Sequence, residues 1–289
     1  MKNIARPLSE STIASSVIAL HCSLGSGRQW DRLAAVLAVR HRVVAPDISG
    51  YGDNPGPCVL PTTLAEEVDL LSARLGDAAG PIHLVGHSYG GALAFKIATD
   101  SSLAGRVRSL TLIEPVLPTI LMENGSDLRL YEHFVRLAHA VYRDLWKGSG
   151  WEAIEKFLAF WRGSEPAEQL PSNVLVRLIA HAEKLAFDFT AILAEQNVTS
   201  AAAAIRVPTL LVSGGLSPCL TQRIIGRLAA TIPAAETWHL PAAGHMLPIS
   251  DAAAVNPAIA RHMARADEFA SLSLVPRDPS EQTAAPLLG

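Results

Sequence analysis

The sequence predicts an α/β fold, with a mostly parallel sheet flanked by helices and an inserted all-helical cap. Short runs of β-branched and other apolar residues alternate with longer helical patterns, which is typical of parallel strands joined by crossover helices. This alternation stops between residues 117 and 203, where one helical pattern follows another, and then it resumes. A chain of 289 residues has room for one large domain with such an insertion.

The composition indicates a soluble globular protein. Hydrophobic residues make up 49% of the chain and charged residues 18%. The formal net charge of -3 and the lack of a Lys/Arg block argue against a nucleic-acid partner. No apolar run is long enough to span a bilayer and no signal-peptide pattern opens the chain, so we expect no membrane partner. The three cysteines, a small and odd number, favour a reducing compartment, and we therefore expect a cytoplasmic protein.

The first part of the chain contains the expected strands and helices of a parallel sheet. Strands are expected at residues 16–21, 41–45, 82–85 and 107–113, because each is a short buried-type run. Helices are expected at residues 28–37, 62–75 and 89–99. Thr62 or Thr63 can cap the second of these helices.

The second part begins with the helical insertion. Helices are expected there at residues 128–146, 151–161 and 173–193. Strands at residues 207–212 and 236–240 and helices at residues 221–230 and 252–265 then restore the alternation. We therefore divide the chain into a core of residues 1–116 and 204–266, a helical cap of residues 117–203 and a tail of residues 267–289. The prolines and weak periodicity of the tail indicate disorder.

The strongest chemical signal is the segment Gly86-His87-Ser88-Tyr89-Gly90, which matches G-x-S-x-G between an expected strand and a helix of small residues. A serine hydroxyl is a poor nucleophile unless a base lies beside it. A sharp strand-to-helix turn lifts the hydroxyl clear of the backbone, and the two glycines permit the close approach that this turn needs. The following helix points its first N–H groups at developing negative charge. Ser88 is therefore the expected nucleophile.

Four segments resemble, in the right order, those of the α/β-hydrolase superfamily. They are residues 21–23 (HCS), similar to its oxyanion loop; 47–52 (DISGYG), similar to the turn after the next strand; 82–92 (IHLVGHSYGGA), similar to its nucleophile elbow; and 244–246 (GHM), similar to the loop of its catalytic histidine. The resemblance extends from about residue 17 to residue 265. It implies a serine hydrolase in which His245 accepts the Ser88 proton.

The acid that should orient His245 is absent from the place where the family commonly has it. That place is the loop after the strand at residues 207–212, but this loop reads SGGLSP, and no Asp or Glu occurs in residues 213–235. A second location in the family is the end of the preceding core strand, where this chain has Glu114. A carboxylate there would lie at the carboxyl edge of the sheet, beside the cap. Glu114 is therefore expected to complete a triad with Ser88 and His245.

Backbone N–H groups should stabilise the oxyanion that forms during such a reaction. Tyr89, directly after the nucleophile, is one expected donor. Ser23 is the other, although the family usually has glycine where this chain has Cys22. Most of the aromatic residues fall in the expected cap, so we expect an apolar substrate pocket between cap and core, with Trp30 and Met246 as core-side walls.

These expectations describe a serine hydrolase that cleaves a carboxylic ester or a related acyl compound through a Ser88 acyl-enzyme. The substrate would be an apolar small molecule, and no metal or organic cofactor would be needed. Two alternatives remain open: C–C bond hydrolysis of a diketone-like substrate by the same residues, and a non-catalytic member of the fold that binds a ligand in the pocket. The oligomeric state is not predicted.

Overall fold

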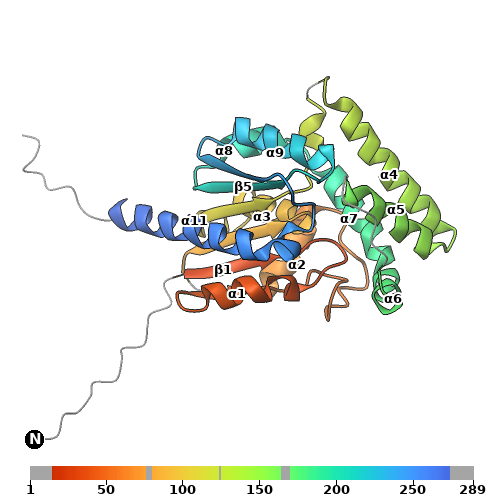
Figure 1. Ribbon diagram of the computed structural model, residues 1–289, viewed down its shortest axis with the longest axis horizontal. Helices are drawn as coiled ribbons and strands as arrows, with labels where there is room; N and C mark the ends of the chain where they lie inside the picture. Colours follow the sequence, from red (N-terminus) through yellow and green to blue (C-terminus); the bar gives the residue numbers. More distant parts are fainter. Residues whose placement is uncertain (1–14, 76–79, 124, 164–169, 274–289) are drawn as a thin grey trace, which may run out of the picture.

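A six-stranded parallel sheet lies at the centre of the structure, a computed structural model that describes residues 15–75, 80–123, 125–163 and 170–273 (Figure 1). The strands are β1 (Ser15–Leu20), β2 (His41–Val44), β3 (Ile82–His87), β4 (Val107–Ile113), β5 (Thr209–Gly214) and β6 (Ala235–Leu240). Their order is β2-β1-β3-β4-β5-β6, and each neighbouring pair in the described chain is parallel. Every residue of β1, β3 and β5 is buried, as expected of strands covered on both faces. The predicted fold class is confirmed.

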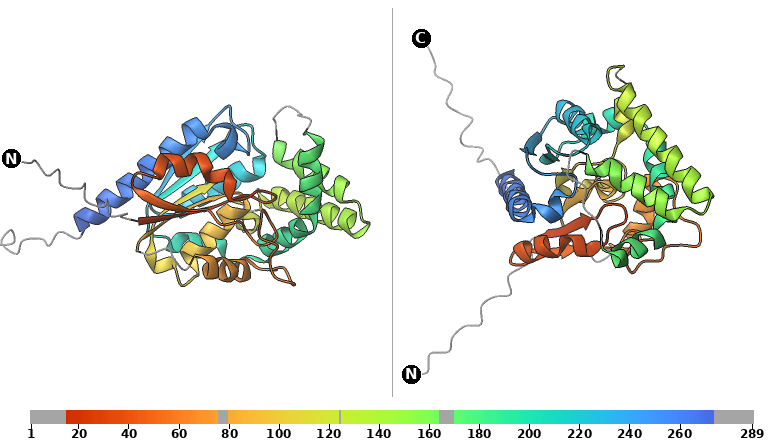
Figure 2. Two further views of the ribbon diagram at one scale, coloured as in Figure 1. Left: turned by 90° about the horizontal axis from the view of Figure 1, so that it is seen from below. Right: turned by 45° about the vertical axis from the view of Figure 1, so that its right-hand side comes forward.

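Helices cover both faces of this sheet (Figure 2). One face carries α1 (Asp31–Leu37), the short α10 (Leu247–Ser250) and α11 (Ala252–Ser273), and the other carries α2 (Leu64–Arg74), α3 (Tyr89–Thr99) and α9 (Cys219–Thr231). Side chains alternate between the two faces along a strand. In β1, Val17 and Ala19 belong to the hydrophobic cluster of α1 and α11. Ile18 and Leu20 belong to the cluster of α2 and α3, so each face has its own core.

Five α-helices stand between β4 and β5 in the described chain (Figure 1). They are α4 (Leu128–Trp146), α5 (Gly150–Arg162), α6 (Ser172–Ala180), α7 (Ala182–Ala194) and α8 (Val198–Ala204), and we call them the inserted helices. Helices α4 to α7 lie beyond the carboxyl ends of the strands, whereas α8 packs beside α9. Helices α4 to α7 therefore cover the carboxyl ends of the strands, where ligands of open α/β sheets bind.

The single helix expected over residues 173–193 is two helices in the structure, α6 and α7. The chain turns at His181, where the Nδ1–H donates to the carbonyl oxygen of Gly50 at 2.8 Å. Helix α6 buries none of its residues, while α7 buries seven. The break lets α6 follow the surface and α7 pack inward, and no Gly or Pro marks it in the sequence.

Helix α11 is longer than expected and corrects the boundary of the predicted tail. Residues 267–273 are helical and extend the helix beyond the expected end at residue 265. Asp267 accepts a hydrogen bond from Arg108 of β4 at 3.0 Å, and Ala266 is 2% exposed. The rest of the predicted tail, residues 274–289, lies outside the described residues. Neither α11 nor any other helix among the described residues is long and apolar enough to cross a membrane.

Candidate active site

Ser88 occupies a sharp turn between β3 and α3. Its φ of 56° and ψ of -119° form a conformation that residues other than glycine adopt rarely and at a cost in free energy. Packing requires the flanking glycines: a Cβ on Gly86 would lie 2.2 Å from the Gly90 carbonyl oxygen, and a Cβ on Gly90 would lie 2.3 Å from that of Leu20. Helix α3 thus approaches β1 and β3 closely, and the turn holds Ser88 at the carboxyl edge of the sheet.

A chain of hydrogen bonds links Ser88, His245 and Glu114. Ser88 Oγ lies 3.0 Å from His245 Nε2, and His245 Nδ1 lies 2.6 Å from Glu114 Oε2. The three residues are buried, with exposed fractions of 4%, 3% and 0% in that order. When Nδ1–H donates to the carboxylate, Nε2 presents its lone pair to the hydroxyl, which is the arrangement that a general base needs. The structure brings together the three residues that the sequence suggested as a triad.

The backbone around Glu114 fixes the direction of its side chain. Its φ is 43°, and its N–H donates to the Val212 carbonyl oxygen at 3.0 Å. Glu114 Oε1 accepts the N–H of Gly214 at 2.7 Å, which leaves Oε2 for His245. Gly214, at the end of β5, therefore supplies a hydrogen-bond donor to Glu114, the residue directly after β4.

His87 and Gln29 hold the His245 backbone in place. His87 Nε2–H donates to the His245 carbonyl oxygen at 2.8 Å, and Gln29 Nε2–H donates to His87 Nδ1 at 3.2 Å. Burial, with a further contribution from His245, lowers the pKa of His87 well below its ordinary value. A neutral imidazole has one donor and one acceptor nitrogen, and this network uses both. His87 therefore supports the loop of His245 and does not face Ser88 as a second base.

Ser23 and Tyr89 line a small cavity beside Ser88. Within the described chain, the backbone N–H groups of both residues have no hydrogen-bond partner in the protein. Cys22 cannot replace Ser23 as a donor, because its N–H donates to Gln29 Oε1 at 3.2 Å. Burial raises the pKa of the Cys22 thiol to about 12, so the thiol stays protonated and is a poor nucleophile.

The inserted helices roof this cavity. Their aromatic lining consists of Phe134 of α4, Phe157 and Trp161 of α5, and Phe189 of α7. The Trp161 ring stacks on the His245 imidazole, with the ring centroids 4.3 Å apart and an angle of 20° between the planes. The cavity measures about 10 Å³, which is at most the room of one water molecule. The space beside Ser88 is therefore smaller than any organic substrate.

The two residues expected as core-side walls do not line this cavity. Trp30 is 1% exposed and packs in the cluster under α1 and α11. Met246 directs its side chain outward and is 39% exposed. The expectation failed because both residues are near the site in the chain, whereas the cavity walls come from the inserted helices. Trp161 was not singled out in the sequence, where it is one of many aromatic residues in the insertion.

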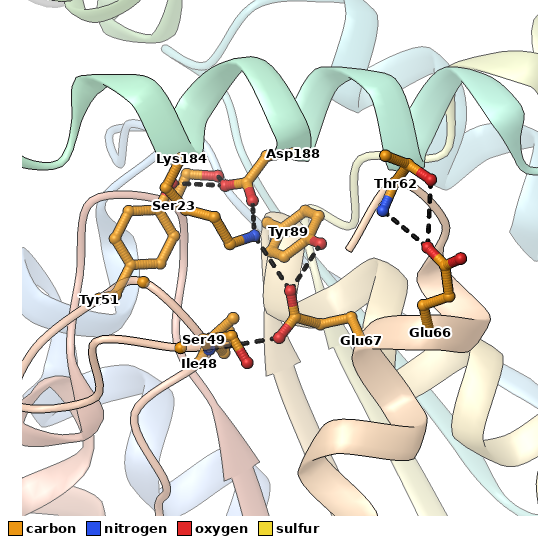
Figure 3. Close-up of polar contacts among 12 residues, drawn as sticks. Ser23, Ile48, Ser49, Tyr51, Thr62, Glu66, Glu67, Tyr89, Lys184 and Asp188 are labelled. Atoms are coloured by element: carbon orange, nitrogen blue, oxygen red, sulfur yellow. Dashed lines mark hydrogen bonds and ion pairs between the residues drawn. The ribbon is translucent and has the colours of Figure 1, made fainter. Parts of the chain in front are cut away.

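A group of buried charged residues joins α7 to the core beside the same cavity (Figure 3). This charged cluster consists of Lys184 and Asp188 of α7 and Glu67 of α2, which are 2%, 1% and 0% exposed. Burial alone would lower the pKa of Lys184, but Asp188 and Glu67 outweigh it and raise that pKa. This cluster was not among the residues predicted from the sequence. Its signal was present, because Lys184 and Asp188 stand one turn apart on the inward face of a largely apolar helix.

A larger cleft of about 480 Å³ lies between the loop of residues 50–60 and the turn from α6 to α7. None of Ser88, His245 and Glu114 lines it. Lys184 lines this outer cleft, whereas its ion-pair partner Asp188 lines the small cavity. The charged cluster thus separates the two spaces, and of Ser88, His245 and Glu114 only Ser88 lines the inner one.

Comparison with known proteins gives the family of the chain. Residues 17–258 match the model of the alpha/beta hydrolase family. A RutD protein of Klebsiella pneumoniae (strain 342), whose name describes a carbamate hydrolase, is 30% identical over 252 residues, covering 83% of this chain and 88% of that protein. Among solved structures, MenH from S. aureus has a TM-score of 0.72 at 18% identity and covers 88% of this chain and 94% of that chain. A thermophilic esterase from Thermogutta terrifontis has a TM-score of 0.66 at 23% identity, covering 88% and 90%.

The family match extends from β1 into α11 and includes Ser88, Glu114 and His245. The two solved structures are less than 25% identical to the chain, so they support the fold alone. The resemblance recognised in the sequence is confirmed. This protein is a hydrolase and belongs to the alpha/beta hydrolase family.

Proposed function

We propose that this hydrolase cleaves a carboxylic ester, or a related acyl compound, through an acyl-enzyme on Ser88. The observation that carries the proposal is the hydrogen-bonded chain from Ser88 Oγ through His245 to Glu114. A serine at a strand-to-helix elbow, with a buried histidine and carboxylate behind it, is arranged for nucleophilic attack on a carbonyl carbon. No step of this reaction needs a metal or an organic cofactor.

In the first half of the reaction, Ser88 Oγ attacks the carbonyl carbon while His245 Nε2 takes the hydroxyl proton. The imidazolium that results is stabilised by the Glu114 carboxylate at Nδ1. The negative charge on the former carbonyl oxygen is stabilised by the N–H groups of Ser23 and Tyr89. When the tetrahedral intermediate collapses, the C–O bond to the alcohol breaks, and the alcohol takes the proton from His245.

In the second half, water replaces the alcohol. His245 takes a proton from the water as its oxygen attacks the acyl carbon of the Ser88 ester. The second tetrahedral intermediate collapses to the free acid, and Ser88 regains its proton from His245. Atoms and charge balance over the cycle, since one water is consumed and one acid and one alcohol are released.

The walls of the cavity support an apolar substrate. Phe134, Phe157, Trp161 and Phe189 make up the aromatic part of its lining. A cavity of about 10 Å³ cannot hold an ester, so entry requires the roof of inserted helices to shift. The same roof then excludes water from the Ser88 and His245 side chains while the acyl group is transferred. We therefore expect medium-sized apolar acyl groups to be cleaved better than charged ones.

A carbamate is a second candidate substrate, favoured by the likeness to a protein named as a carbamate hydrolase. Its carbonyl carbon would be attacked by Ser88 in the same way, with the same proton transfers through His245. The discriminating test is the ratio of turnover on an ester and on a carbamate that share one leaving alcohol.

Labelling with a fluorophosphonate tests the proposal, because only an activated serine reacts rapidly with this probe. Wild-type protein should be labelled and should hydrolyse p-nitrophenyl esters in a panel of acyl chain lengths. Ser88→Ala should lose both properties while keeping its fold, with turnover falling on the order of a millionfold. Equal turnover by the two proteins would rule out Ser88 as the nucleophile. A wild-type protein that binds panel members without labelling or turnover would favour the non-catalytic alternative.

A further inference from the structure

The charged cluster reaches toward Ser23 and Tyr89, two residues that line the Ser88 cavity (Figure 3). On one side, Asp188 Oδ2 accepts hydrogen bonds from Ser23 Oγ at 2.5 Å and from the Tyr51 hydroxyl at 2.6 Å. Asp188 Oδ1 is bound by Lys184 Nζ. The side chain of Ser23, a residue of the loop after β1, is thus tied to helix α7.

On the other side, the cluster holds Tyr89. Lys184 Nζ lies 4.8 Å from the centroid of the Tyr89 ring and 3.0 Å from Glu67 Oε2. The Tyr89 hydroxyl donates to the same Glu67 oxygen at 3.5 Å, and the N–H of Ser49 donates to Glu67 Oε1 at 3.2 Å. Every carboxylate oxygen of the cluster therefore has a partner, and Tyr89 is held between the Lys184 ammonium and the Glu67 carboxylate.

We propose that Lys184, Asp188 and Glu67 are positioning residues that hold Ser23 and Tyr89 so that their N–H groups meet at the oxyanion. This inference rests on the proposed function, since it assigns a role in the same reaction. The three residues fix the positions of the oxyanion donors and do not themselves touch the substrate carbonyl.

Stability alone does not explain such a cluster. Removing charges from water is costly, and a buried ion pair often contributes no more to folding than apolar residues of the same volume. What ion pairs and hydrogen bonds provide is direction, because their strength depends on the positions of donor and acceptor. Here those directions converge on Ser23 and Tyr89, which line the Ser88 cavity, where an error of about 1 Å can reduce the rate a hundredfold.

The arrangement also couples the oxyanion donors to the roof. Lys184 and Asp188 belong to α7, one of the inserted helices that line the cavity. If α7 shifted to admit a substrate, Ser23 would lose its bond to Asp188 and Tyr89 its contact with Lys184. The oxyanion hole is then fully assembled only when the roof has closed over the substrate.

The test uses Lys184→Met and Asp188→Asn, which remove charge and preserve side-chain volume. Both are assayed with a p-nitrophenyl ester that the wild-type protein hydrolyses. We expect kcat to fall between about tenfold and a hundredfold while KM stays within about threefold, because the lost interaction matters in the transition state. The matched control is Lys156→Met, which breaks the ion pair of Lys156 with Asp144 between α5 and α4. It should leave kcat unchanged.

A second measurement separates positioning from a merely structural role. In a thionoester, sulfur replaces the carbonyl oxygen and accepts hydrogen bonds poorly, so its cleavage depends little on the oxyanion donors. The preference for the oxoester over the thionoester should fall at least fivefold in both cluster variants and stay constant in Lys156→Met. Folded variants with an unchanged preference would overturn the inference, even if their melting temperatures fell.

Ser23→Ala provides the same test without disturbing a buried charge, in case the cluster variants fail to fold. It removes only the hydroxyl that binds Asp188 and keeps the backbone N–H. Its preference for the oxoester should also fall, by a smaller factor, and an unchanged preference in this folded variant would contradict the inference. Failure of the proposed function would be seen separately, as a wild-type protein that cleaves no ester.

Discussion

The carboxylate that contacts His245 comes from the end of β4, although the loop after β5 is the commoner place for such an acid in this family. Glu114 can serve from there because its backbone turns at φ 43° and because Gly214 donates to one of its oxygens. The other oxygen is then aimed at His245 Nδ1. The φ angle of Glu114 and the N–H group of Gly214 thus set the direction of the Glu114 side chain, and neither can be read from the sequence.

The variant Glu114→Gln should lower kcat between about a hundredfold and ten-thousandfold. The amide oxygen can keep the bond from Gly214, and the amide NH₂ would then face His245 Nδ1. An imidazole that accepts at Nδ1 carries its proton on Nε2, where it cannot accept the Ser88 proton. Steady-state kinetics with a p-nitrophenyl ester measure the loss, and the exposed Glu132→Gln serves as the control. Unchanged turnover in Glu114→Gln would show that His245 works without this carboxylate.

At the scale of elements, the elbow depends on how closely α3 can approach the sheet. Gly90→Ala should abolish turnover and destabilise the fold, because its Cβ would collide with the backbone of β1. The matched control is Gly226→Ala in α9, where a Cβ meets nothing within 4 Å. That change should stabilise the protein by roughly 0.5–1 kcal/mol, since alanine favours a helix interior. Urea unfolding and the ester assay check both variants, and a stable, active Gly90→Ala protein would refute the packing argument.

The elements that follow local rules could be predicted from the sequence. Buried strands and amphipathic helices have clear periodicities, and the elbow has a motif, so the sheet, most helices and Ser88 were all foreseen. The sequence could not show which inserted helix meets which strand end, because that depends on packing between distant segments. For this reason Trp30 was expected at the cavity, where the structure places Trp161, and the contact of Asp188 with Ser23 was missed.

At the scale of the whole molecule, buried neutral histidines should make the fold sensitive to acid. Burial is the largest cause that lowers the pKa of His21 to about 4, and burial likewise lowers that of His83 to about 4. His21 Nε2 accepts the N–H of Ile48 at 2.9 Å, which an imidazolium cannot do. The unfolded histidines have a pKa of about 6.5. The unfolded chain therefore binds more protons between about pH 6.5 and pH 4, and stability should fall as the pH falls through this window.

Urea unfolding at pH 7.5, 6.0 and 5.0 measures this dependence. The midpoint should drop steadily with pH, and the drop should be smaller in His21→Asn, which has no imidazole to protonate. His139→Asn, at an exposed position on α4, should follow the wild-type curve. A midpoint that stays constant from pH 7.5 to pH 5.0 would contradict the assignment of His21 as a buried neutral group.

The proposed reaction depends on a covalent intermediate at Ser88, and trapping that intermediate is the most direct test. Wild-type protein is mixed with excess p-nitrophenyl ester, quenched in acid during turnover, and its intact mass is measured, followed by digestion to locate the modified peptide. We expect a mass increase equal to one acyl group, on the peptide that contains Ser88, and no increase in Ser88→Ala. Continued turnover by Ser88→Ala, or an acyl group found on another residue in the wild-type protein, would contradict the proposed reaction.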